Sequence, residues 1–250
     1  MTVEGSEALQ GCDTRRIPAV RGRTGVERFP IRRMLLETTV RRLNERGLAL
    51  LTKAAQALDV AEPQASWKEI LPLWARASEG TLGRAARCPM VLLDFNFQRL
   101  EWWSQVITAQ GSQESRRPRL SAFHTEEAIS LARELLLEAW SAARAMPPVS
   151  SLVFGMAPEV STLIARLSPR DLDRVVVQEI QDLRPRWENR PIFWRELFHA
   201  ATQMDDQILA NVHLHCLQLL GGEFASTLDN SMVLANGSKS LMREASLEEN

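Results

Sequence analysis

Helical spacing dominates the pattern of apolar and polar positions along the chain. Over 31–58, apolar residues recur three and four positions apart with arginines between them, and the same period returns over 125–146 and over 191–220. This period places apolar side chains on one stripe of a helix. It predicts three long amphipathic helices, the first broken near Gly47 and the last a single helix of about thirty residues. We therefore expect an all-α fold.

Start and stop signals divide this pattern into elements. Ser168 and Asp171 occupy the N-cap and third positions of a predicted helix, and Thr125 is suited to cap another. Gly221 and Gly222 are suited to end the last helix. The run 90–95 is the one segment whose apolar residues are consecutive enough to predict a buried strand.

A polar stretch with several helix-breaking residues separates two halves. Each half has a long leucine-rich helix, a short proline-bounded helix and an aromatic helix, so the chain is two helical bundles or halves. A degenerate tandem repeat is one interpretation, and the order shared by any two helical bundles is the other. The predicted organisation is a flexible basic arm over 1–30, an N-terminal helical domain over 31–110, a linker over 111–122, a C-terminal helical domain over 123–222 and a disordered tail over 223–250.

Composition indicates where the protein resides more clearly than what it does. The chain has 250 residues, is 45% apolar and carries a formal net charge of -1, so it can bury a core but has no global field that would steer a ligand. No apolar run approaches the length of a membrane span, and the first residues lack a secretory signal pattern. We expect a cytoplasmic protein. Cys12, Cys88 and Cys216 are odd in number and far apart, which predicts free thiols.

Positive charge is concentrated near the N-terminus. Ten arginines between Arg15 and Arg46 face three glutamates, a local excess of +7. Such a segment can neutralise phosphates or enter a minor groove. A solvated helix face behind a basic leader is the alternative. The candidate nucleic-acid-binding residues are Arg15, Arg16, Arg21, Arg23, Arg28, Arg32 and Arg33.

The sequence contains no convincing catalytic or metal-binding motif. His213 and Cys216 would share one helical face, but two ligands are too few for a structural zinc ion. There is no Gly-x-Ser-x-Gly turn, and the tail segment 237–240 lacks the pattern of a phosphate loop. We expect no catalytic residue, no cofactor and no metal, and therefore a protein that is not an enzyme. The alternative is an enzyme whose groups converge only in three dimensions, with His199, His213 and Cys216 as candidates.

One stretch of the second half resembles a known family. Phe154-Gly155-Met156-Ala157-Pro158-Glu159-Val160, then Leu163, then Leu167-Ser168-Pro169-Arg170-Asp171-Leu172 resembles the flagellar transcriptional regulator FlhD family, over about residues 125–200. The resemblance implies an all-helical regulator that dimerises and acts with a protein partner to activate transcription of flagellar or secretion genes. This chain is about twice the expected size, and the basic-aromatic stretch of the family is present only as Arg184-Pro185-Arg186-Trp187. If the first half is a diverged copy, one chain would mimic the dimer of the family.

Two functions follow as hypotheses. The first is a non-enzymatic transcriptional activator of flagellum biogenesis that resembles FlhD and acts through a protein partner, with DNA binding left open. The second is a cytoplasmic adaptor or chaperone of a type III secretion or flagellar apparatus, which would dock partners through helix 191–220 and its aromatic residues. We expect a protein partner and no membrane insertion, and self-association is left open. The candidate partner-binding residues are Phe193, Trp194 and Trp187.

Overall fold

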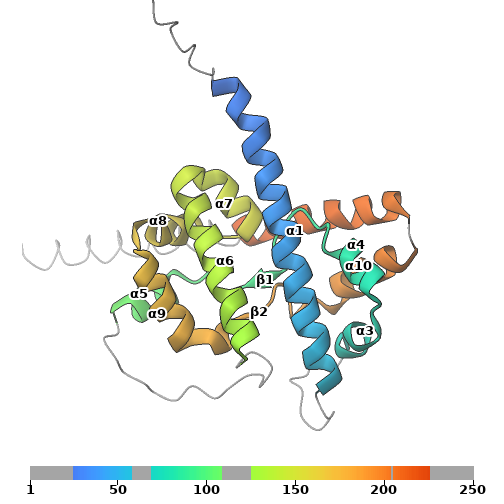
Figure 1. Ribbon diagram of the computed structural model, residues 1–250. Helices are drawn as coiled ribbons and strands as arrows, with labels where there is room; N and C mark the ends of the chain where they lie inside the picture. The colour runs from blue at the N-terminus through green and yellow to red at the C-terminus, as the bar shows by residue number, and fades with distance from the viewer. Residues whose placement is uncertain (1–24, 58–68, 109–124, 204, 226–250) are drawn as a thin grey trace, which may run out of the picture. The chain divides into compact units, whose positions relative to one another are not determined.

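The computed structural model (Figure 1) describes residues 25–57, 69–108, 125–203 and 205–225, with side chains from Leu35 onward. Its contacts divide the chain into two units, Met1–Leu35 and Leu36–Asn250. The second unit is described below. The elements of the described residues confirm the all-α prediction. In chain order they are α1 (Gly25–Ala57), α3 (Leu71–Arg76), α4 (Glu79–Ala85), β1 (Leu93–Asp94), α5 (Leu100–Thr108), α6 (Glu126–Ala145), α7 (Pro147–Phe154), α8 (Pro158–Arg166), α9 (Pro169–Glu179), the 3-10 turn η2 (Ile180–Asp182), β2 (Arg184–Pro185), α10 (Pro191–Gln203) and a further helix over 206–225.

Local capping fixes two helix starts as predicted. The hydroxyl of Ser168 accepts the N–H of Asp171 at 3.2 Å, and the Asp171 carboxylate accepts the N–H of Ser168 at 3.1 Å, which completes a capping box. The hydroxyl of Thr125 accepts the N–H of Ala128 at 3.1 Å and begins α6. These signals lie within four residues, so the sequence alone reveals them.

Two helix boundaries differ from the prediction. Gly47 does not break α1, and a Cβ atom there would lie 2.8 Å from Cδ1 of Leu93. The glycine therefore allows β1 to approach the helix closely. The predicted single helix 191–220 is two helices, because Asp205 accepts the N–H groups of Gln207 and Ile208 and caps a new start. The second of these helices continues past Gly221 to residue 225.

The described parts of both predicted halves contribute to one hydrophobic core. Apolar side chains on either side of the predicted linker 111–122, which lies outside the described residues, belong to the same buried cluster. Of the predicted strand 90–95, only Leu93 and Asp94 form a strand, while the whole run except Asp94 is buried. A consecutive apolar run thus marks a core-crossing loop as readily as a strand.

The side chain of Asn44 on α1 forms hydrogen bonds with the backbone of this loop. Its side chain is fully buried, and Nδ2 lies 3.4, 3.2 and 2.9 Å from the carbonyl oxygens of Ala86, Cys88 and Met90. Its Oδ1 accepts the N–H of Leu92 at 2.8 Å. The backbone groups of a buried loop need such partners because they make no helical hydrogen bonds. One asparagine therefore supplies partners for most of the segment that leads into β1.

The chain contains a structural repeat. The first copy is α3, α4, β1 and α5, and the second is α8, α9, β2 and α10. Helices α3 and α8 end at Arg76 and Arg166, and the next helix in each copy begins after a serine N-cap, Ser78 or Ser168. These positions are about 90 residues apart, and a constant spacing of this kind is the signature of internal repetition.

The turns after the two strands correspond residue by residue. Asn96 and Trp187, each two residues after its strand, are the two non-glycine residues with positive φ among those described, both at 55°. Their carbonyl oxygens accept the N–H groups of Arg99 and Arg190 at 2.9 and 2.8 Å. Backbone geometry thus shows the repeat more clearly than side-chain identity does.

A local two-fold relation connects the two copies. Strand β1 pairs antiparallel with β2, Leu93 opposite Pro185 and Asp94 opposite Arg184, so each copy makes the same pairing with the other (Figure 1). The aromatic helix of each copy also contacts the other copy: α10 packs closely on α4, whereas α5 makes a slighter contact with both α8 and α9. The reciprocal strand pairing is the pattern of an isologous interface. It explains why the two halves share one core.

Ion pairs also join the two long helices α1 and α6. The pairs join increasing positions of α1 to decreasing positions of α6, so the two helices run antiparallel. They are Arg42 with Glu138 at 3.3 Å, Arg46 with Glu134, and Lys53 with Glu127 at 2.8 Å.

No single described helix has the length and apolar composition of a membrane span, although the bent pair α7 and α8 meets both criteria together.

Candidate functional site

The predicted docking aromatics lie in the core, which corrects the prediction. The exposed fractions of Phe193, Trp194 and Trp187 are 1%, 0% and 6%. Trp194 also donates its indole N–H to the carbonyl oxygen of Arg186 at 3.1 Å. The aromatic stripe of α10 is therefore its packing face, and these three side chains present no surface to a partner.

The predicted nucleic-acid-binding arginines fall in the first unit. Arg15, Arg16, Arg21 and Arg23 lie outside the described residues, and Arg28, Arg32 and Arg33 belong to the first turns of α1. The last three of the ten arginines have acidic neighbours, Arg41 with Glu45, Arg42 with Glu134 and Glu138, and Arg46 with Glu134. The excess of +7 is therefore partly balanced, and the residues before position 36 remain the basic candidates.

The metal candidates do not converge. His213 is half-buried, its Nε2 has no hydrogen-bond partner, and burial lowers its pKa below the usual value. Neighbouring His215 instead contacts Glu196 through Nδ1 at 2.8 Å. Within the described parts of the chain, no three histidine, cysteine or acidic side chains are grouped as metal ligands.

Cys88 and Cys216 lie side by side, although they are far apart in the sequence. Their sulfur atoms are 3.6 Å apart and both side chains are buried. The hydrogen bond with Cys216 lowers the pKa of Cys88, whereas that bond and burial raise the pKa of Cys216. Burial keeps such thiols unreactive in the folded protein. Sequence spacing gives no sign of this contact.

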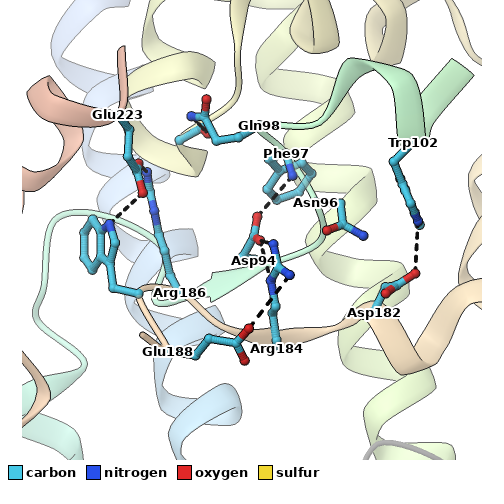
Figure 2. Close-up of polar contacts among 12 residues, drawn as sticks. Asp94, Asn96, Phe97, Gln98, Trp102, Asp182, Arg184, Arg186, Glu188 and Glu223 are labelled. Carbon is cyan, nitrogen blue, oxygen red and sulfur yellow. Dashed lines mark hydrogen bonds and ion pairs between the residues drawn. The ribbon is translucent and has the colours of Figure 1, made fainter. Parts of the chain in front are cut away.

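One group of polar side chains lies around the paired strands (Figure 2). Arg184 of β2 donates from Nε and Nη2 to one oxygen of Asp94 at 2.8 and 2.6 Å, and its Nη1 lies 3.9 Å from Glu188. Burial alone would lower the pKa of Arg184, but Asp94 and then Glu188 outweigh it and raise the pKa above its usual value. The other oxygen of Asp94 accepts the N–H of Phe97 at 3.1 Å.

Arg186 forms a second ionic group nearby. Its exposed fraction is 4%, and its Nη2 donates to Glu223 at 2.7 Å. The indole N–H of Trp187 donates to the other carboxylate oxygen of Glu223 at 2.7 Å. The guanidinium also lies over the Trp187 ring, 4.6 Å from its centroid. Glu223 was predicted to begin a disordered tail, and the structure instead places it in helix 206–225.

A cavity of about 460 Å³ lies between these two groups. Arg184, Arg186 and Glu188 line it from β2 and the following turn, and Gln98 and Gly155 line it from other elements. Its lining contains carboxylates, guanidinium groups and amides, and none of the described residues that form it offers a hydroxyl, thiol or imidazole. The cavity can therefore bind a polar or charged group.

Comparisons with protein-family models, curated proteins and solved structures find no match to this chain. The likeness to the FlhD family therefore rests on the residues quoted for it.

Proposed function

We propose that this protein is a transcriptional regulator without catalytic activity, which binds a protein partner and DNA. In this proposal it resembles FlhD, activates flagellar or secretion genes, and carries in one chain the two copies that a dimer would supply. The observation that supports it most is the repeat, because the two copies pair reciprocally through β1 and β2 and each aromatic helix contacts the other copy.

The local structure of the resembling stretch also supports the proposal. Gly155 has φ of 65°, which is a left-handed conformation that ends α7 and turns the chain into α8. The capping box at Ser168 then begins α9. A turn, a short helix and a capped helix are the features on which the resemblance rests.

DNA contact is assigned to the arginines of the first unit. A variant with Arg15, Arg16, Arg21 and Arg23 changed to glutamine removes four charges outside the described core. A control variant removes four exposed arginines of the second unit, namely Arg99, Arg166, Arg170 and Arg190. Both variants carry the same net charge, so a difference between them in DNA binding depends on where the four arginines lie in the chain.

The measurement is fluorescence anisotropy of a labelled DNA duplex across a salt series. We expect the first variant to bind more weakly, with a salt slope shallower by about 0.9 for each phosphate that the protein no longer neutralises. The control variant should keep the slope of the unaltered protein. Equal slopes for both variants would contradict a role for these arginines in DNA binding.

The adaptor hypothesis is the alternative, and its predicted docking residues are buried. An adaptor would use other, exposed apolar residues instead, such as Leu214 and Leu217 of helix 206–225. Purification of the tagged protein with secretion or flagellar components, and without DNA, would favour this alternative.

A further inference from the structure

Arg186 carries a buried charge, whereas the equivalent position in the first copy of the repeat holds an apolar side chain. Position 186 of the second copy corresponds to Phe95 of the first, because β1 corresponds to β2 and Asn96 to Trp187. Phe95 is fully buried and makes an edge contact with Trp102, 5.8 Å between ring centroids. Burial of a guanidinium is unfavourable because the group loses its hydration, and its partners must compensate. The fold accepts a phenylalanine here, so packing alone does not account for the arginine.

The guanidinium of Arg186 has a donor group without a hydrogen-bond partner. Its Nη2 is bonded to Glu223, but its Nη1 is buried and has no hydrogen-bond partner. A guanidinium commonly binds a carboxylate through two parallel N–H groups. Unpaired polar groups in a native core are rare, and this one belongs to a residue that lines the cavity.

The surroundings hold Arg186 in place. A Cβ atom on Gly155 would lie 1.7 Å from its Nη2, so the absence of a side chain there lets the guanidinium lie against the backbone. Trp187 has φ of 55°, which asparagine tolerates at the corresponding Asn96 but a bulky residue adopts at a cost. That conformation accompanies the hydrogen bond from the Trp187 indole to Glu223.

We propose that Arg186, Trp187 and the adjoining cavity form a binding site for a carboxylate ligand, and that Glu223 is the internal carboxylate that occupies part of it. The cavity is large enough for a small dicarboxylate or an acidic amino acid, and an acidic side chain of a protein partner has the same chemistry. A ligand would compete with Glu223 for Nη2 and for the indole N–H, and it would reach the buried Nη1 only once Glu223 is displaced. This site is independent of the proposed contact with DNA.

The test is isothermal titration of the full-length protein with glutarate at constant ionic strength. Glu223→Gln removes the internal competitor with little change in shape, and should bind glutarate at least about tenfold more tightly than the unaltered protein. Glutaramide, the neutral diamide, should not bind. Glu196→Gln is the matched control, because it removes an acid that contacts the same helix through His215 but does not line the cavity.

A second variant tests the arginine itself. Arg186→Phe combined with Glu223→Gln restores the residue of the first copy, and should fold because an apolar replacement of a buried ion pair is often neutral or stabilising. This double variant should show no glutarate binding. Tighter binding of an acetylated glutamate peptide than of glutarate would identify a partner side chain as the ligand, and the reverse would identify a small molecule.

Two results would overturn the proposal. The first is no saturable binding of glutarate or of the peptide to Glu223→Gln up to about 10 mM. The second is equal binding of glutarate and glutaramide, which would show that the carboxylate is not recognised. Because glutaramide is tested on Glu223→Gln, the second result does not depend on folding of the double variant.

Discussion

Replacement of Asn44 should destabilise the fold more than any other polar substitution on the described part of α1. The side chain is fully buried and serves three carbonyl oxygens and one N–H group of the loop 86–92. Asn44→Ala removes every one of these partners at once. Water cannot replace them without entering the core, so the backbone groups would stay unpaired.

The expected loss of stability can be worked from these hydrogen bonds. The amide NH₂ has two hydrogens, so it satisfies two of the three carbonyl groups fully, and Oδ1 satisfies the N–H of Leu92. A buried group left without its partner costs about 1–3 kcal/mol. Allowing for some relaxation of the loop, Asn44→Ala should lower the free energy of unfolding by about 2–4 kcal/mol. For a unit of this size, that corresponds to a fall in Tm of roughly 5–15 °C.

The assay is urea unfolding of the full-length protein followed by tryptophan fluorescence. Asn44→Asp provides a sharper comparison, because it keeps the acceptor for Leu92 but places a second oxygen against three carbonyl oxygens. It should be no more stable than Asn44→Ala. Arg41→Ala, which removes an exposed ion pair on the same helix, should cost no more than about 1 kcal/mol. Equal, small losses of stability for Asn44→Ala and Arg41→Ala would refute the role given to Asn44.

Four further changes test separate features. Gly47→Ala should destabilise the protein by about 1–3 kcal/mol in thermal unfolding, although alanine is favoured in helices, because β1 leaves no room for the methyl group; a gain in stability would contradict this close approach. Ser168→Ala should cost about 1 kcal/mol through loss of the N-cap, and Thr162→Ala, exposed on α8, provides a comparison. Burial lowers the pKa of His213, so the unfolded chain binds more protons there than the folded protein as pH falls below about 6.5. The protein should therefore lose stability between about pH 7 and pH 5.5 relative to His213→Gln. Parallel pH profiles of stability for the two proteins would exclude this effect. Cys88 and Cys216 should react with a thiol reagent only at the rate of unfolding, and fast labelling of both in the native protein would contradict their burial.

Local signals predicted the parts of the fold that depend on neighbouring residues. Periodicity located the amphipathic helices, and the capping residues Thr125 and Ser168 located two helix starts. The break before residue 206 was missed because the helical period continues over 191–220, whereas the side chain of Asp205 caps a new helix. Gly47 was interpreted as a helix breaker because the approach of Leu93 is a long-range contact.

The candidate sites depended on long-range contacts and were harder to predict. Burial of Trp194 follows from its packing against Trp74 of the first copy, with ring centroids 5.2 Å apart. The pairing of Arg186 with Glu223 joins segments that the sequence assigned to a domain and to a tail. The repeat was visible only as an order of helices, because divergence such as Phe95 to Arg186 hides it in the side chains and positive φ at Asn96 and Trp187 reveals it.

Sequencing of the DNA crosslinked to the tagged protein in its native cells tests the proposed regulatory function most directly. The unaltered protein should enrich a limited set of promoter fragments near flagellar or secretion genes, and the variant lacking Arg15, Arg16, Arg21 and Arg23 should enrich them less. No enrichment above an untagged control, together with recovery of secretion or flagellar components, would contradict a transcriptional regulator and support an adaptor.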